Sequence, residues 1–71
     1  MKRDFDDIPN DRLTEEIDRW IKSDRDRAML KRRLIDGLTF DELSVEFDLS
    51  RSRIVKICMT AEDRLFRKIA Y

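Results

Sequence analysis

The sequence contains no histidine, one cysteine, one glycine and one proline among its 71 residues. A single thiol forms no internal disulfide, and without histidine it does not complete a zinc or iron site, which needs several thiolate or imidazole ligands. A glycine-rich phosphate loop and a nucleophile with its base are missing as well, so we expect neither an enzyme nor a cofactor. With so few helix-breaking residues, the chain is expected to be all-α.

Long apolar runs are also missing. No stretch approaches the roughly 20 apolar residues that a membrane helix needs, and the first residues are charged. We therefore expect a soluble, cytoplasmic protein with no membrane contact. Its length suits one domain, residues 1–71, that buries only about 60% of the surface of the unfolded chain. Residues 1–8 are expected to fray.

Neither charge dominates, because 16 basic side chains balance 16 acidic ones. The two signs are nevertheless segregated. Residues 50–71 carry six basic and two acidic side chains (net +4), whereas residues 1–26 carry six basic and nine acidic ones (net −3). A positive face of this kind favours nucleic acid. Because surface helices of many small proteins carry similar charges, a merely solvated face stays open as an interpretation at this point.

Two helices are predicted in the first half of the chain. One begins near residues 9–11 and ends near Lys22. The next opens at Ser23, which pairs with Asp26 in a capping box, and Gly37 closes it with left-handed backbone. The apolar positions at helical spacing are Leu13, Ile17, Trp20 and Ile21, followed by Leu30, Leu34 and Ile35.

Residues 39–57 have the pattern of two helices joined by a short turn. Thr39 and Glu42 form the capping box of one, and Ser50 caps a second that runs to about Ala70. This pair predicts a helix-turn-helix within a small four-helix domain, whose long C-terminal recognition helix enters the major groove of DNA. The inward faces carry Phe40, Leu43, Ser44 and Phe47, then Ile54, Ile57, Cys58, Ala61 and Leu65.

Residues 39–43 (Thr-Phe-Asp-Glu-Leu) and 46–54 (Glu-Phe-Asp-Leu-Ser-Arg-Ser-Arg-Ile) resemble region 4 of the sigma-70 family of bacterial RNA polymerase sigma factors. The resemblance extends over residues 24–68, and its Gly-Leu-Thr opening is shared with LuxR-type helix-turn-helix modules. In the sigma family this domain reads the −35 promoter element and contacts RNA polymerase and activators. The resemblance implies a DNA-binding regulator of transcription from a bacterium or phage. Region 2 of the family is not found in these residues, so we expect no promoter melting.

The resemblance also implies individual DNA contacts. Arg51 matches the arginine that contacts a base, and Arg53 matches an adjacent arginine of the same helix. Thr39 and Arg33 match positions that touch phosphates. Lys31 and Arg33 are weaker candidates, because basic residues are common on helix surfaces.

Three other base-facing positions depart from the family. Ser52, Val55 and Lys56 stand where housekeeping sigma factors carry glutamate, arginine and glutamine, so we expect a different sequence preference. Chemically, Arg51 is able to fork onto guanine O6 and N7. Ser52 and Lys56 add single hydrogen bonds, and Val55 meets a thymine methyl. The alternative is that these side chains are merely solvated.

Met59 and Phe66 are predicted to form an apolar strip on the last helix, opposite its core side. Either the N-terminal helix folds across the strip, or two chains pair through it as a homodimer, which suits a DNA reader. Cys58 falls on the inward face and is predicted to be a small buried hydrophobic residue rather than a redox switch. Trp20 is expected to anchor the first helix.

A second function stays open. The same fold serves as a protein-interaction adaptor if it docks on RNA polymerase or another partner through its acidic first helix and apolar strip. Zero net charge, and Val55 in place of an arginine, favour this alternative. Salt dependence separates the two functions, because phosphate contacts make affinity fall steeply with ionic strength.

Overall fold

The computed structural model describes residues 8–70, and within that range it is helical with no strand. Its helices are α1 (Asn10–Trp20), α2 (Asp24–Leu34), α3 (Phe40–Phe47) and α4 (Arg51–Ala70). The prediction of an all-α, four-helix domain is confirmed. Fraying was predicted for residues 1–8, of which residues 1–7 lie outside the described part. Ile8 is described, and it packs against the core.

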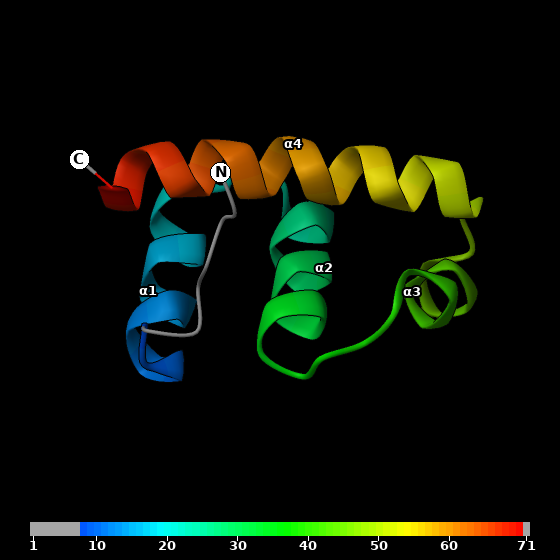
Figure 1. Cartoon of the computed structure of the whole chain (residues 1–71), viewed down its shortest axis with the longest axis horizontal. Helices are drawn as coiled ribbons and strands as arrows, with labels where there is room; N and C mark the ends of the chain where they lie inside the picture. The colour runs from blue at the N-terminus through cyan, green and yellow to red at the C-terminus, as the bar shows by residue number, and fades with distance from the viewer. Residues whose placement is uncertain (1–7, 71) are drawn as a thin grey trace.

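Helix α4 organises the fold. Figure 1 shows it lying across one side of the molecule, with α1, α2 and α3 arranged along it in chain order. Each of these three helices contacts α4, and α2 also contacts α1 and α3. Within the described residues, α1 and α3 share no contact. At 20 residues, α4 is about 30 Å long, which is enough to span all three helices.

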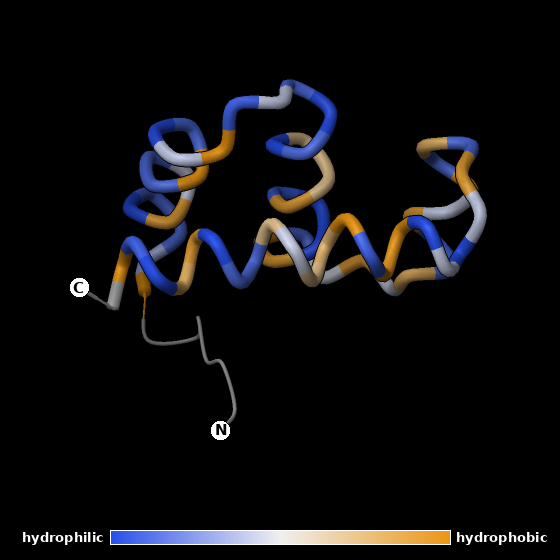
Figure 2. Tube along the Cα trace, turned by 90° about the horizontal axis from the view of Figure 1, so that it is seen from above, coloured by the Kyte–Doolittle hydropathy of each residue, from blue (hydrophilic) through white to orange (hydrophobic). Residues whose placement is uncertain are grey.

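The hydrophobic core has two parts, and apolar positions recur along the whole length of α4 to supply both (Figure 2). The buried residues of the α1-side cluster are Leu13, Ile17, Ile21, Leu30, Ala61 and Leu65. Those of the α3-side cluster are Met29, Leu43, Ile54 and Cys58. The consecutive residues Met29 and Leu30 belong to opposite clusters, so α2 and α4 couple the two parts.

The three predicted N-caps are confirmed, whereas of the two predicted capping boxes only the one at Thr39 and Glu42 is complete. The Ser23 and Ser50 hydroxyls accept from the N–H groups of Asp26 and Arg53, each at 3.3 Å. At α3 the capping box is complete, since the Thr39 N–H donates to Glu42 Oε1 (2.8 Å) and the Glu42 N–H donates to Thr39 Oγ1 (3.1 Å). These local bonds fix where each helix begins, as the side-chain pattern predicts.

The helix ends agree less closely with the sequence pattern. Helix α1 ends at Trp20 rather than near Lys22. Helix α2 ends at Leu34, and Gly37 has the predicted left-handed backbone, with φ of 76°. The Leu38 N–H then donates to the Arg32 carbonyl at 3.1 Å, which turns the chain toward α3.

Trp20 and Cys58 lie where the apolar pattern places them. Trp20 packs against the α1-side cluster, its Nε1 donates to Glu16 Oε1 at 2.9 Å, and Lys68 Nζ lies 4.9 Å from its ring centroid. Cys58 is fully buried in the α3-side cluster, and this burial raises the pKa of its thiol to about 11. A protonated, covered thiol is a packing residue rather than a reactive one.

Among residues 8–70, no helix has the length and apolar character needed to cross a membrane.

Candidate nucleic-acid interface

A turn of three residues, Asp48–Ser50, joins α3 to α4. Asp48 ends α3 in the left-handed conformation, with φ of 55°, which Asp adopts more readily than most side chains. Ser44 holds the turn from inside α3, because its hydroxyl donates to the Leu49 carbonyl (2.8 Å) and its carbonyl accepts from the Leu49 N–H (3.2 Å). Helix α3 is seen nearly end-on in Figure 1 while α4 crosses the picture, so the two helices cross steeply.

A charged cluster of Arg32, Asp36 and Glu46, called the Arg32–Glu46 bracket below, joins α3 to α2. Arg32 donates from Nε to Glu46 Oε2 at 2.9 Å and from Nη2 to Glu46 Oε1 at 2.5 Å, while its Nη1 donates to Asp36 at 2.9 Å. Hydrogen bonding to these carboxylates raises the pKa of Arg32, and the same bonds lower the pKa of Glu46. The bracket orients α3, and through the turn it orients the start of α4.

Two predicted DNA contacts are engaged within the chain. The Arg33 Nη1 donates to the Leu38 carbonyl at 2.8 Å, and its guanidinium lies 4.2 Å from the ring centroid of Phe40. Lys31 Nζ lies 2.7 Å from Asp18 Oδ1 of α1. Both side chains are half-buried, so they are poorer candidates for phosphate contacts than the exposed bases of α4.

The other predicted DNA contacts lie together at the start of α4, except for Thr39 at the start of α3. The side chains of Arg51, Ser52, Arg53 and Lys56 are exposed, and Val55 is half-buried. Arg51 forms an ion pair with Asp41 of α3, with Nε 2.9 Å from Oδ1. Thr39 is exposed too, with its hydroxyl committed as an acceptor to the capping box.

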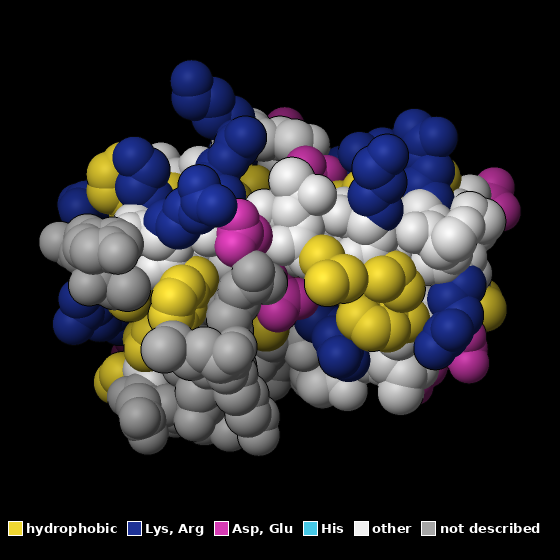
Figure 3. All heavy atoms as spheres, turned by 45° about the horizontal axis from the view of Figure 1, so that its top comes forward, with side chains coloured by type: hydrophobic (Ala, Val, Ile, Leu, Met, Phe, Trp, Pro, Cys, Tyr) yellow, Lys and Arg dark blue, Asp and Glu magenta, His cyan; other side chains and the backbone are white. Residues whose placement is uncertain are grey.

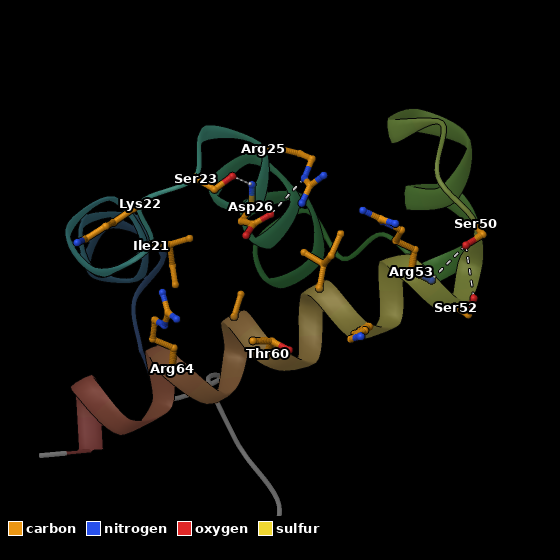
Figure 4. Close-up of a pocket in the computed structure, with 13 residues that line it drawn as sticks. Ile21, Lys22, Ser23, Arg25, Asp26, Ser50, Ser52, Arg53, Thr60 and Arg64 are labelled. Carbon is orange, nitrogen blue, oxygen red and sulfur yellow. Dashed lines mark hydrogen bonds and ion pairs between the residues drawn. The ribbon is translucent and has the colours of Figure 1, made fainter.

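A groove of about 840 Å³ runs beside α4, between that helix and the corner where α1 leads into α2 (Figure 4). The Arg27 Nη1 holds this corner by donating to the carbonyls of Ile21 (2.9 Å) and Lys22 (3.1 Å). In Figure 4, Arg53 points from α4 toward the start of α2, where Arg25 lies. The charged side chains that line the groove are Lys22, Arg25, Arg53, Lys56 and Arg64, with Asp26 as the acidic one.

Lys22, Arg25 and Arg64 were not predicted from the sequence as members of a basic site. They lie on different elements and come together only through packing, so helical periodicity did not join them. One signal was available for α4, because Arg53, Lys56 and Arg64 fall on one side of a helix with 3.6 residues per turn.

Helix α4 carries apolar as well as basic surface. Figure 3, turned so that α4 comes forward, shows Lys and Arg side chains over both ends of the helix and a hydrophobic patch near its start. Met59 is 55% exposed, whereas Phe66 is half-buried and packs against the α1-side cluster. Phe66 packs against the cluster that contains Leu13 and Ile17 of α1, which agrees with the alternative in which the N-terminal helix covers part of the strip, and pairing of two chains through the strip stays a prediction. Val45 of α3, 84% exposed, was not singled out from the sequence.

No family model matches this chain, and comparison with curated proteins and with solved structures finds no significant similarity. The resemblance to sigma region 4 therefore stays a prediction that rests on residues 24–68 of the sequence.

Proposed function

We propose that this protein is a sequence-specific DNA-binding regulator of transcription that places the first turns of α4 in the major groove. The observation that carries the proposal is the exposure of Arg51, Ser52 and Lys56 at the start of a helix that flanks a basic groove. A helix is the element that the major groove admits, and its N-terminus favours nearby phosphate through backbone N–H groups and the helix dipole.

The side chains at the start of α4 match base edges in type. Arg51 has terminal nitrogens for guanine O6 and N7, while Ser52 and Lys56 each supply a single polar contact. Val55 offers its exposed part to a thymine methyl. The exposed Arg53 lines the groove and suits a phosphate better than a base.

The basic groove supplies the sequence-independent part of binding. The groove is lined by five basic side chains and one carboxylate, so its net positive charge attracts a phosphate backbone. Ser52, Arg53 and Lys56 line the groove as well as the start of α4, which makes the two surfaces continuous. A strand whose bases meet α4 therefore continues along cationic surface toward Lys22 and Arg25.

Selection from random duplexes at two salt concentrations tests this function. We expect one motif to be enriched, and the logarithm of affinity to fall with the logarithm of salt by about 0.9 for each phosphate contacted. Arg51→Ala should then weaken binding to the selected duplex by about 1–3 kcal/mol. Failure to enrich any motif, or equal affinity of wild type and Arg51→Ala, would contradict the proposal.

The matched control for that substitution is Arg12→Ala. Arg12 is exposed in the first turn of α1, and Figure 1 shows that α1 begins at its end farthest from α4. Arg12→Ala removes one positive charge, as Arg51→Ala does, so any long-range effect of net charge on DNA affinity appears in both variants. Only Arg51→Ala should change which duplexes are preferred.

The second candidate is an adaptor that docks on RNA polymerase or another protein with little DNA affinity. The hydrophobic patch near the start of α4 (Figure 3) and the exposed side chains of Val45 and Met59 favour it, because contiguous exposed apolar surface marks protein-interaction sites. Val45→Asp distinguishes the two candidates, since it should leave the DNA preference of a regulator intact and abolish docking of an adaptor.

A further inference from the structure

An ion pair lies across the turn between α3 and α4, at the surface proposed to face DNA. Arg51 is the first residue of α4 and Asp41 is the second residue of α3. Their closest contact joins Arg51 Nε to Asp41 Oδ1 at 2.9 Å, and the side chains are 64% and 80% exposed. Both partners therefore remain accessible to a ligand while they contact each other.

Folding stability is a poor explanation for this pair. Ion pairs that are this exposed contribute little, because water and salt screen them and ordering two side chains opposes them. Asp41 also supports the N-terminus of α3 through the helix dipole, but this needs no contact with Arg51. Moreover, a carboxylate beside the reading surface repels phosphate, which weakens binding that ignores sequence.

The contact through Nε has a consequence for recognition. A guanidinium offers donors on two sides: the Nε side and the end formed by the two terminal nitrogens. A carboxylate whose closest contact is with Nε leaves Nη1 and Nη2 outside that contact. Those two nitrogens are the pair that forks onto guanine O6 and N7.

We propose that Asp41 is the specificity-determining positioning residue of this interface, which by its contact with Nε favours the orientations of Arg51 that present Nη1 and Nη2 to guanine. This role rests on the DNA-binding function proposed above. Asp41 acts through Arg51 and need not touch a base itself. Its negative charge has a second effect, because it disfavours complexes in which phosphates approach the start of α4 without the guanine contact.

Asp41→Asn is therefore expected to have two opposite effects. Preference for guanine over the other bases at the Arg51 position should fall by about fivefold to tenfold, because the fork loses its orientation. Affinity for an unrelated duplex should rise by about twofold to fivefold at low salt, because a repulsive charge is removed. A purely structural role would lower both affinities together.

The experiment measures competition binding of wild type, Asp41→Asn and Asp48→Asn to four duplexes that differ only at the guanine position, and to an unrelated duplex. Asp48→Asn is the matched control, because Asp48 is exposed in the same turn region and Asn tolerates its left-handed backbone. It should leave the guanine preference unchanged. Thermal unfolding of each variant checks that all are folded.

A double-substitution cycle with Arg51→Ala isolates the coupling. In the Arg51→Ala background, Asp41→Asn should no longer change base preference but should still raise affinity for the unrelated duplex. Unchanged guanine preference in Asp41→Asn, or an equal loss in Asp48→Asn, overturns the role of Asp41. If wild type selects no sequence at all, the DNA-binding function itself fails, so the two failures are distinguishable.

Discussion

The two ends of α4 are held in different ways. At the α1-side cluster, four buried residues from α1, α2 and the segment between them pack against Ala61 and Leu65 in the C-terminal half of α4. The α3-side cluster has four buried residues, and polar contacts surround it: the capping box, the Ser44 bonds in the turn and the Arg32–Glu46 bracket. The comparison indicates that apolar burial is more extensive at the α1 end, although polar contacts occur there too, whereas the smaller α3-side cluster depends more on directional bonds next to the exposed bases.

The largest effects should come from the two clusters themselves. Leu13 and Leu43 are fully buried, one in each cluster, so Leu13→Ala and Leu43→Ala should each lower the free energy of unfolding by about 2–5 kcal/mol. Since α2 and α4 contribute to both clusters, each variant should unfold in one transition. Urea titration followed by circular dichroism and by Trp20 fluorescence checks this. Separate midpoints for the two signals would show that the clusters unfold independently.

Removal of the helix caps should have a smaller effect and should distinguish the two ends. Thr39→Ala breaks the complete capping box of an eight-residue helix, and we expect it to lower the free energy of unfolding by about 1–2 kcal/mol. Ser23→Ala removes one bond from the longer α2 and should have about half that effect. Chemical denaturation of both variants measures the difference. A larger loss in Ser23→Ala would contradict the proposed reliance of the α3 end on directional bonds.

Acid should produce the smallest effect, and it should act on the α3 end. Hydrogen bonds from Arg32 lower the pKa of Glu46 below 4.5, and bonds to Thr39 lower the pKa of Glu42 below the same value. A carboxyl group whose pKa is lower in the folded state stabilises the fold at pH values above its unfolded-state pKa. That contribution is lost as the pH falls through the folded-state pKa. The melting temperature should therefore decrease when the pH is lowered below about 4.5. Glu46→Gln should make this decrease smaller. An unchanged drop in Glu46→Gln would remove Glu46 from the explanation.

The helix starts were predictable because their signals are local. Ser23, Thr39 and Ser50 each bond to a backbone N–H three residues later, so short stretches of sequence contain the whole interaction. The inward face of α4 followed from periodicity in the same way, with Ile54 and Leu65 fully buried.

Features that depend on packing between helices were not predictable by the same means. Phe66 was predicted to lie opposite the core side of α4, yet it is half-buried and packs against the α1-side cluster together with Ile69. Arg33 is engaged by Leu38 and Phe40, which periodicity does not reveal. The basic groove and the Arg51–Asp41 pair join residues from different helices, so their geometry appears only in the folded chain.

Amide chemical-shift mapping during titration with the selected duplex tests most directly whether the α3 end of α4 meets DNA. We expect the largest changes at residues 51–56, weaker changes at residues 22–25 along the groove, and little change in the first turns of α1. Changes concentrated in α1, with residues 51–56 unaffected at saturation, would contradict the central claim that the start of α4 reads the duplex.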